Sequence, residues 1–412
     1  MKPADAMSGR RHLHASDLRG AARLAIDAVV QTTSVVEGMH LNISRAWPFG
    51  PALEGRTSGI TGLVYECIRG VSSMVGMGLD TVLAPVAALL DQAGSSTERE
   101  AVVAAVNGVV GDHLEDSANP LAIPMSLRRE GRALELRREA LAVEFPQASD
   151  RLVVLVHGLC MSDLQWSRHG HEHGAALARD FGCSAVYLHY NSGRHVSTNG
   201  GEFSWLLEAL VREWPVPVRE LTLLGHSMGG LLARSACQQA SHAGHDWPAK
   251  LKRMIFLGTP HHGAPLERHG NRLQNFVAGL SPYVAPLARL GMLRSAGVTD
   301  LRHGNLLDQD WGDYGRFENV GDCRSIVPLP PQVRSYALAA TLGKKPRDPG
   351  DRWLADGLVP VWSALGEHRD TARDLGIPAA RRWIGYGMSH WDLLSRLEVY
   401  AEISYCFGEN TA

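Results

Sequence analysis

The sequence lacks an excess of charge of either sign and lacks a framework of paired cysteines. Its 412 residues include 41 lysines and arginines against 43 aspartates and glutamates, so nothing in the charge favours nucleic acid as a partner. The six cysteines form no Cys-x-x-Cys pair and no regular spacing. Residues 1–20 are polar, without the apolar core of a secretory signal. We therefore expect a cytoplasmic protein with reduced thiols.

Long apolar runs are also scarce, and one stretch, Gly70–Leu90, approaches the length of a bilayer span. Its single charged residue is Asp80, and Pro85 interrupts it. We interpret it as a buried or paired helix in a helical domain. The alternative is a segment that contacts or enters a membrane, because Gly76 and Gly78 would allow close helix contact. Peripheral membrane contact through the N-terminal helices therefore stays open.

The hydrophobic pattern changes near Pro146. Before this point, apolar residues recur at three- and four-residue spacing, which predicts helices over Leu18–Ile43, Gly59–Leu90, Thr97–Leu114 and Ser126–Phe145. We expect residues 1–147 to form an all-helical N-terminal region and residues 148–412 to form the catalytic domain.

After Pro146, short apolar runs alternate with helical segments, which is typical of a parallel sheet covered on both faces. The predicted strands are Leu152–Val156, Ser184–His189, Leu221–Leu224, Arg253–Leu257, Tyr336–Ala340 and Arg382–Gly385. The predicted helices are Gly174–Phe181, Glu202–Trp214 and Leu231–Gln239. Residues 265–322 are too long for a simple connection, so we expect a cap or lid there. The predicted fold class is α/β, with a doubly wound, mostly parallel sheet.

A Gly-x-Ser-x-Gly pattern, Gly225-His-Ser-Met-Gly229, lies between a predicted strand and a predicted helix. This context is typical of a nucleophile elbow, a sharp turn that pushes a serine hydroxyl out of the sheet edge. Side chains at Gly225 and Gly229 would collide with the neighbouring strand and helix. We therefore predict Ser227 as a nucleophile.

Three further motifs follow strands, and the last two follow the serine in the chain order that a Ser–Asp–His triad of this type requires. His157-Gly-Leu159 places the Leu159 N–H beside that of Met228, and these two groups are the expected oxyanion donors. Asp356-Gly-Leu-Val-Pro supplies the expected acid, and Gly-Met-Ser-His390 the expected base. The rivals for these two roles are Asp313, Asp322, Asp351 and His368.

Other histidines also invite assignment. We expect His261 and His262, which precede the acid, to shape the pocket or hold loops. His171 and His173, with a carboxylate between them, have the ligand types of a metal site, but we interpret their segment as the loop that opens a helix.

Two further features of this sheet edge also invite assignment. Arg194 and His195 follow a strand at the same sheet edge, so they either contact a substrate head group or belong to a structural loop. Cys160 we interpret as a packed small residue rather than a second nucleophile.

On these motifs, the chain from about Asp150 resembles the α/β-hydrolase superfamily of serine esterases and lipases. It is most similar to the bacterial branch related to GPI inositol-deacylases and lecithin–cholesterol acyltransferases. The resemblance rests on His157-Gly-Leu, Gly225-His-Ser-Met-Gly-Gly, Gly258-Thr-Pro-His-His-Gly, Asp356-Gly-Leu-Val-Pro and His390. It leaves the helical N-terminal part unaccounted for.

We therefore expect a serine hydrolase that cleaves carboxylic esters through an acyl-serine, without cofactor or metal. The expected cap and the apolar N-terminal helices favour a lipid ester. Two alternatives remain: an acyltransferase that uses the same acyl-serine, and a catalytically silent, membrane-associated binding protein with this fold.

Overall fold

The computed structural model describes residues 14–44, 97–264, 295–311, 322–345 and 356–408, together with 65–66, 69–70, 72–74, 77 and 80. Contacts divide the chain into two compact units. The first falls within residues 1–99 and 114–122, and the second within 100–113 and 123–412. Helix α3 (Thr97–Asp116) contributes residues to both units.

The first unit contains helix α1 (Ala15–Ser44), close to the predicted range. The described positions of the predicted helix Gly59–Leu90 are also helical, and the other positions lie outside the described residues. Arg19 and Arg23 of α1 each bind the Asp80 carboxylate at 2.5 Å. These hydrogen bonds hold the pKa of Asp80 below its usual range. None of the helices in the described ranges combines the length and apolar character that a membrane crossing requires.

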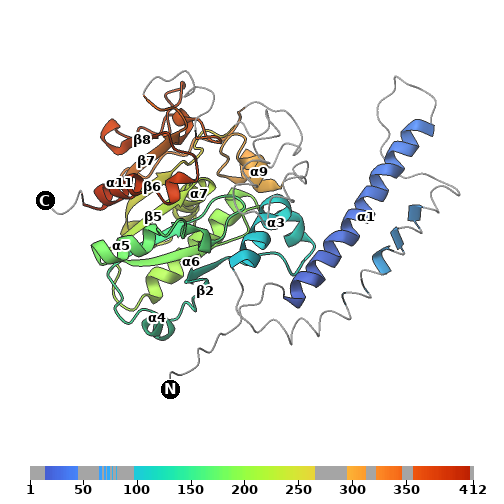
Figure 1. Ribbon diagram of the computed structural model, residues 1–412, viewed down its shortest axis with the longest axis horizontal. Helices are drawn as coiled ribbons and strands as arrows, with labels where there is room; N and C mark the ends of the chain where they lie inside the picture. The colour runs from blue at the N-terminus through green and yellow to red at the C-terminus, as the bar shows by residue number, and fades with distance from the viewer. Residues whose placement is uncertain are drawn as a thin grey trace. The chain divides into compact units, whose positions relative to one another are not determined.

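The second unit is built on an eight-stranded sheet of order β2-β1-β4-β3-β5-β6-β7-β8, with β2 and β8 at opposite edges (Figure 1). Strands β3 to β8 run parallel, and β1 pairs antiparallel with both β2 and β4. The strands are β1 Ser126–Arg129, β2 Arg132–Ala133, β3 Arg151–Val156, β4 Ser184–His189, β5 Glu220–His226, β6 Leu251–Leu257, β7 Arg334–Thr341 and β8 Arg382–Tyr386. All six predicted strands are present, and the predicted α/β class is confirmed.

The prediction of a helix over Ser126–Phe145 is wrong for most of its length. Residues 126–133 form the β1–β2 hairpin instead, and only α4 (Arg138–Glu144) is helical. The two turn residues, Glu130 (φ 50°) and Gly131 (φ 76°), are both left-handed, which is the geometry of a tight hairpin turn. Pairing with β4 satisfies the β1 backbone and buries Leu127, so tertiary contact outweighs the helical spacing.

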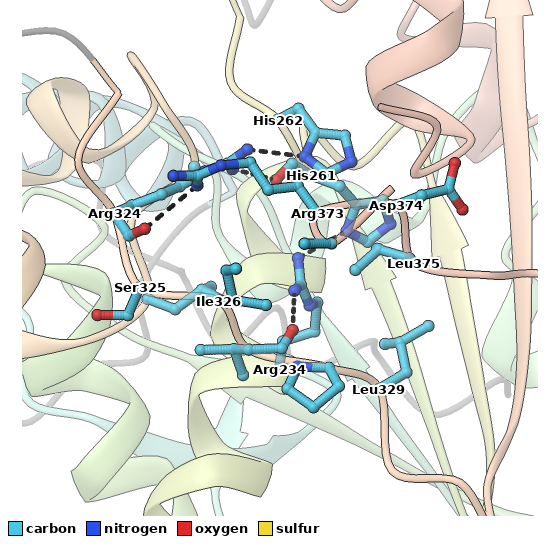
Figure 2. Close-up of a pocket in the computed structure, with 15 residues that line it drawn as sticks. Arg234, His261, His262, Arg324, Ser325, Ile326, Leu329, Arg373, Asp374 and Leu375 are labelled. Atoms are coloured by element: carbon cyan, nitrogen blue, oxygen red, sulfur yellow. Dashed lines mark hydrogen bonds between the residues drawn. The ribbon is translucent and has the colours of Figure 1, made fainter. Parts of the chain in front are cut away.

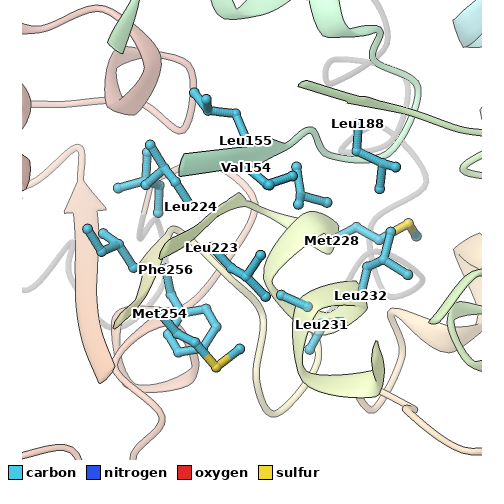
Figure 3. Packing of buried hydrophobic residues seen from close by; sticks show 14 of the residues in the cluster. Val154, Leu155, Leu188, Leu223, Leu224, Met228, Leu231, Leu232, Met254 and Phe256 are labelled. Atoms are coloured by element: carbon cyan, nitrogen blue, oxygen red, sulfur yellow. The ribbon is translucent and has the colours of Figure 1, made fainter. Parts of the chain in front are cut away.

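The core of the second unit lies around the central strands (Figure 3). Residues 152–156 of β3 are almost completely inaccessible, because helices cover both faces of a parallel sheet. Each such apolar side chain contributes about 1.5–3 kcal/mol on burial. Figure 3 shows side chains of β3, β5 and β6 meeting those of the elbow helix α7 (Met228–Ala243), among them Met228, Leu231 and Leu232. The core therefore holds the elbow rigidly against the sheet.

Helix α6 (Val196–Glu213) packs against α7 and begins earlier than the predicted Glu202. Its first turns contain residues of low helix propensity, but the Asp300 carboxylate accepts a hydrogen bond from the Val196 N–H at 2.8 Å and fixes the start. Gly200 permits the close helix contact, since a Cβ there would lie 2.2 Å from Ser235 Oγ. A distant side chain thus sets this boundary.

The second unit contains further helices within the described residues. They are α5 His173–Phe181, η1 Asp163–Trp166, η2 Trp247–Lys250, α9 Ala296–Asp300, η4 Asp308–Asp310, α10 Val361–Ala364, η6 Ala379–Arg381, η7 Asp392–Leu394 and α11 Leu397–Gly408. Of the predicted cap, residues 265–322, the structure describes 295–311 and 322, and the rest lies outside the described residues.

Candidate active site

Ser227 lies in a strained turn between β5 and α7. Its φ of 54° and ψ of −126° fall where a side chain makes the backbone costly. The Ser227 N–H donates to the Leu257 carbonyl at the end of β6 (2.8 Å), and the Ser227 carbonyl accepts from the Gly230 N–H (3.1 Å). These bonds, with the core beneath, hold the strain in place.

The two glycines of the pattern are required by close backbone contacts. A Cβ at Gly229 would lie 2.2 Å from the Val156 carbonyl oxygen, and one at Gly225 would lie 2.6 Å from the Gly230 nitrogen. Neither distance is possible for a real side chain, since both neighbours are backbone atoms. The prediction that side chains at Gly225 and Gly229 would collide with their neighbours is therefore confirmed.

Asp356 and His390 form a buried pair. The Asp356 Oδ2 lies 2.6 Å from the His390 Nδ1, and the Asp356 Oδ1 accepts from the Leu358 and Val359 N–H groups at 2.9 and 2.8 Å. The His390 N–H also donates to the Asp356 carbonyl at 3.0 Å. Because an ionised carboxylate only accepts hydrogen bonds, Nδ1 carries the proton, and the basic lone pair of the neutral ring is on Nε2.

This pair is close to the serine turn. A Cβ at Gly258 would lie 3.0 Å from His390 Cε1, so the ring rests on the residue that follows β6. The His390 ring centroid is 4.7 Å from that of His226, which immediately precedes Ser227. The structure thus brings the predicted nucleophile, acid and base to one edge of the sheet.

The predicted oxyanion donors also lie at this edge. Met228 is the first residue of α7, so its N–H has no partner within the helix. Leu159 and Ser227 both border a small apolar cavity of about 20 Å³. It is lined by Leu159, Ser227, Pro260, Ala264, Leu301, Leu358 and Val359.

The loop after β3 is supported by contacts that the sequence did not reveal. Cys160 adopts a φ of 59°, and its N–H donates to Ser192 Oγ at 2.9 Å. A Cβ at Gly108 of α3 would lie 2.1 Å from Cys160 Sγ. Burial raises the pKa of the Cys160 thiol to about 12, so it stays protonated and packed, as expected. In the sequence, the feature that could have indicated such a close contact is the pair of glycines, Gly108 and Gly111, in an otherwise helical stretch.

The rival residues are placed elsewhere or lie outside the described ranges. The Asp322 carboxylate binds Arg324 at 3.2 Å and Arg373 at 3.5 Å. His368 Nδ1 accepts from the Asp370 N–H at 3.0 Å, in a half-buried loop. Asp313 and Asp351 are not among the described residues.

The segment around His171 and His173 forms a helix start. The Glu172 carboxylate accepts from the Gly174 and Ala175 N–H groups at 2.7 and 2.6 Å, as an N-cap does. His173 Nδ1 lies 2.9 Å from His171 Nε2, and its own Nε2 lies 2.9 Å from the Leu393 carbonyl. Both ring nitrogens of His173 are therefore engaged, which favours the loop interpretation.

Arg194 and His195 take part in structural contacts. Arg194 binds Glu202 at 2.7 Å, while His195 binds Asp300 at 3.1 Å and stacks on Trp311 with ring centroids 3.7 Å apart. Burial raises the pKa of Asp300, although hydrogen bonds from His195 oppose this shift. These contacts join the loop after β4 to the segment around α9.

Within the described part of the chain, one cluster has the residue types and spacing of a metal site: Glu100, Asp163 and His189. The Arg128 guanidinium already lies 3.1 Å from Glu100 and 3.3 Å from Asp163. It supplies the positive charge that the two buried carboxylates need. We therefore interpret the cluster as a buried ion-pair network beneath the edge of the sheet.

A mostly parallel sheet in which a strand passes through a strained serine turn into a helix, with an acid and a histidine following in that chain order, defines the α/β-hydrolase class. Residues 147–312 match the family model described as "PGAP1-like alpha/beta domain". This part of the chain is accordingly similar to the PGAP1-like α/β domain, and its fold is that of the α/β-hydrolases.

Solved structures show distant similarity. A lipase of Bacillus licheniformis in its mature form shares 17% identity, with 62% of this chain and 91% of the lipase covered and a TM-score of 0.40. An esterase of Pyrococcus furiosus shares 13% identity, with coverage of 63% and 81% and a TM-score of 0.38. Phospholipase PlaB of Legionella pneumophila shares 16% identity, with coverage of 52% and 45% and a TM-score of 0.33. No curated protein matches the sequence at a significant level.

Proposed function

We propose that the protein is a serine hydrolase that cleaves carboxylic esters through an acyl-serine intermediate. The observation that carries the proposal is the strained Ser227 at the edge where the buried Asp356–His390 pair, joined at 2.6 Å, also lies. A serine hydroxyl needs an adjacent base to become a nucleophile, and that base needs an orienting partner.

In this mechanism the Ser227 hydroxyl attacks the acyl carbonyl while His390 Nε2 takes its proton. Asp356 holds the ring and stabilises its charged form. The N–H groups of Leu159 and Met228 donate to the oxyanion, and each such donor typically contributes about 10²–10³ in rate. The histidine then gives its proton to the departing alkoxide. Water, deprotonated by the same nitrogen, attacks the acyl-serine and releases the acid.

The acyl group is proposed to be lipophilic. The described residues that border the cavity at Ser227 are mostly aliphatic, which suits an acyl chain better than a polar group. An acyltransferase, with an alcohol in place of water as acceptor, remains the second candidate, since the same residues would form the acyl-serine. A cytoplasmic location remains a prediction.

The test is labelling of the purified full-length protein with a fluorophosphonate probe. We expect the probe to label the wild type and to leave Ser227→Ala unlabelled. Ser241→Ala, an exposed serine on the same helix, is the matched control and should label like the wild type. Persistent labelling of Ser227→Ala would exclude Ser227 as the nucleophile. An unlabelled wild type would favour the catalytically silent alternative.

Release of p-nitrophenol from esters of increasing chain length then measures acyl preference. A rate that rises with chain length supports the lipophilic acyl group. Product analysis with an added alcohol distinguishes the two enzymes, because a transferase yields the new ester where a hydrolase yields the free acid.

A further inference from the structure

A second cavity, of about 130 Å³, lies in the same unit, and its lining includes three arginines and two histidines (Figure 2). Arg234 comes from the elbow helix α7, and His261 and His262 come from the loop after β6. Arg324 and Arg373 come from two later segments. One water needs only about 10–15 Å³ of such space, so the cavity is large enough for a small polyatomic ion.

Arg234 carries a charge that no carboxylate in the described residues balances. Its side chain is buried, and its two terminal nitrogens contact neutral groups. One donates to the Val327 carbonyl at 2.6 Å, and the other lies 3.3 Å from His261 Nδ1. Its Nε is buried without a hydrogen-bond partner. Burial lowers the pKa of Arg234 to about 9, which still leaves it protonated at neutral pH.

The neighbouring charges do not neutralise this guanidinium. Arg324 and Arg373 share the single carboxylate of Asp322, at 3.2 and 3.5 Å, while Asp370 lies 3.8 Å from Arg373 on an exposed side chain. The acid that lines the cavity, Asp374, lies 4.0 Å from Arg382, which balances its charge. Asp374 accepts from the N–H groups of Gly376 and His368 at 2.7 and 3.2 Å.

The hydrogen bonds of the two histidines at this cavity also bear on anion binding. Arg324 donates to the His262 Nδ1 at 2.7 Å, so that nitrogen accepts and the His262 Nε2 carries the proton. The Nε2 of His261 is buried without a hydrogen-bond partner in the described part of the chain. A buried, unpaired cation and an unsatisfied ring nitrogen on His261 are costly, unless a ligand with several acceptor oxygens meets them.

We propose that this cavity binds a tetrahedral oxyanion of the phosphate type, either free phosphate or the phosphate of a phosphomonoester, with Arg234 as its principal partner. A guanidinium fits such oxygens because its N–H groups point in a fixed, planar fork. The anion would also fix the loop at His261, and Pro260 of that loop borders the cavity at Ser227.

The experiment measures thermal unfolding of the full-length protein with added inorganic phosphate, with glycerol 3-phosphate, and with chloride at the same ionic strength. Saturating phosphate is expected to raise the Tm by about 2–5 °C, and chloride is expected to leave it unchanged. Glycerol 3-phosphate that acts as well as phosphate identifies a phosphomonoester site, and phosphate acting alone identifies a site for the free ion. Equal effects of chloride and both phosphates would overturn the proposal.

Arg234→Met distinguishes a binding residue from a structural one. It removes the unpaired charge, so the Tm without phosphate is expected to stay the same or rise while the phosphate-dependent shift disappears. Arg212→Met, an exposed position on α6, should keep the full shift. A phosphate-dependent shift that survives in Arg234→Met overturns the proposal.

If Arg234→Met does not fold, Arg373→Gln at the less buried side of the cavity must weaken phosphate binding about tenfold. Because no carboxylic ester is used, failure here is separable from failure of the Ser227 chemistry.

Discussion

At the scale of single residues, Asp356 divides its two carboxylate oxygens between two tasks. Oδ1 accepts from the N–H groups of Leu358 and Val359 and so fixes the loop, while Oδ2 faces His390 Nδ1. An asparagine at this position would keep the first contact through its carbonyl oxygen. It would place an N–H₂ group against the N–H of the ring.

Asp356→Asn is therefore expected to preserve the fold but to lower the ester hydrolysis rate. The histidine is forced into the wrong tautomer, and the loss expected is about 10⁴-fold. Steady-state rates with a p-nitrophenyl ester measure it, and an unchanged Tm shows that the loop survives. Asp246→Asn, at an exposed position, is the control and should keep the wild-type rate. A loss below about tenfold would mean that another residue is the acid.

The glycines of the serine turn give a second residue-scale prediction. Gly229→Ala places a Cβ 2.2 Å from a carbonyl oxygen of β3, so the strand and helix must separate. We expect destabilisation of about 1–3 kcal/mol or more, together with loss of activity. Urea unfolding measures the free energy.

Gly201→Ala in α6 is the matched control for this substitution. A Cβ at Gly201 meets nothing within 4 Å, and alanine favours a helix over glycine by about 0.5–1 kcal/mol. The control should therefore be as stable as the wild type or more so. Equal stability of Gly229→Ala and Gly201→Ala would contradict the close contact at the turn.

At the scale of elements, the sequence predicts the helices and strands whose local sequence pattern is enough to identify them. The central strands are continuous apolar runs because both sheet faces are covered, and the serine turn is bounded by glycines that only backbone contact explains. The hairpin β1–β2 was missed because its strands are short and rich in arginine. The start of α6 was missed because it depends on Asp300, far along the chain.

The candidate site follows the same division. Ser227, Asp356 and His390 were predictable because each follows a strand, and parallel strands end at one edge. The basic cavity was not predictable, because Arg234, Arg324 and Arg373 come from separate segments. No spacing in the sequence relates these three residues, and only the packing of the loops on α7 brings them together.

The hairpin turn offers a test at this scale. Glu130 has a φ of 50°, a conformation in which most side chains are strained and asparagine is favoured. Glu130→Asn is therefore expected to raise the free energy of unfolding by several tenths of a kcal/mol, up to about 1 kcal/mol. Gly131→Ala is expected to have the opposite effect, because a Cβ there would also lie 3.0 Å from Leu164. A lower Tm for Glu130→Asn would contradict this turn geometry.

At the scale of the whole molecule, the N-terminal unit carries apolar side chains on its surface. Leu18, Met74 and Met77 are 61–62% exposed. We propose that they contact membranes peripherally. Replacing all three by glutamine is expected to shift the protein from the vesicle pellet to the supernatant in co-sedimentation. Val143→Gln, at a similarly exposed residue of the other unit, should not. Equal recovery of wild type and triple variant in the supernatant would remove this proposal.

Acid stability of the whole fold depends on buried neutral histidines. Burial lowers the pKa of His157 to about 3 and those of His173 and His262 to about 4, and it holds the pKa values of His226 and His261 well below the usual value. In the unfolded chain these groups titrate near 6.5. Between pH 6.5 and about 4 the unfolded chain therefore binds more protons than the folded one, so stability present above pH 6.5 is lost as the pH falls.

The free energy of unfolding is accordingly expected to fall by about 1.4 kcal/mol per pH unit for each fully buried histidine in this window. Urea unfolding at several pH values between 7.5 and about 4.5 measures the slope. His173→Gln should flatten it, whatever its effect at neutral pH, because one proton-linked group is removed. The exposed His242→Gln should leave the slope unchanged. Stability that stays constant down to pH 4.5 would mean that these rings accept protons without cost, which contradicts the burial of His157, His173, His226 and His261.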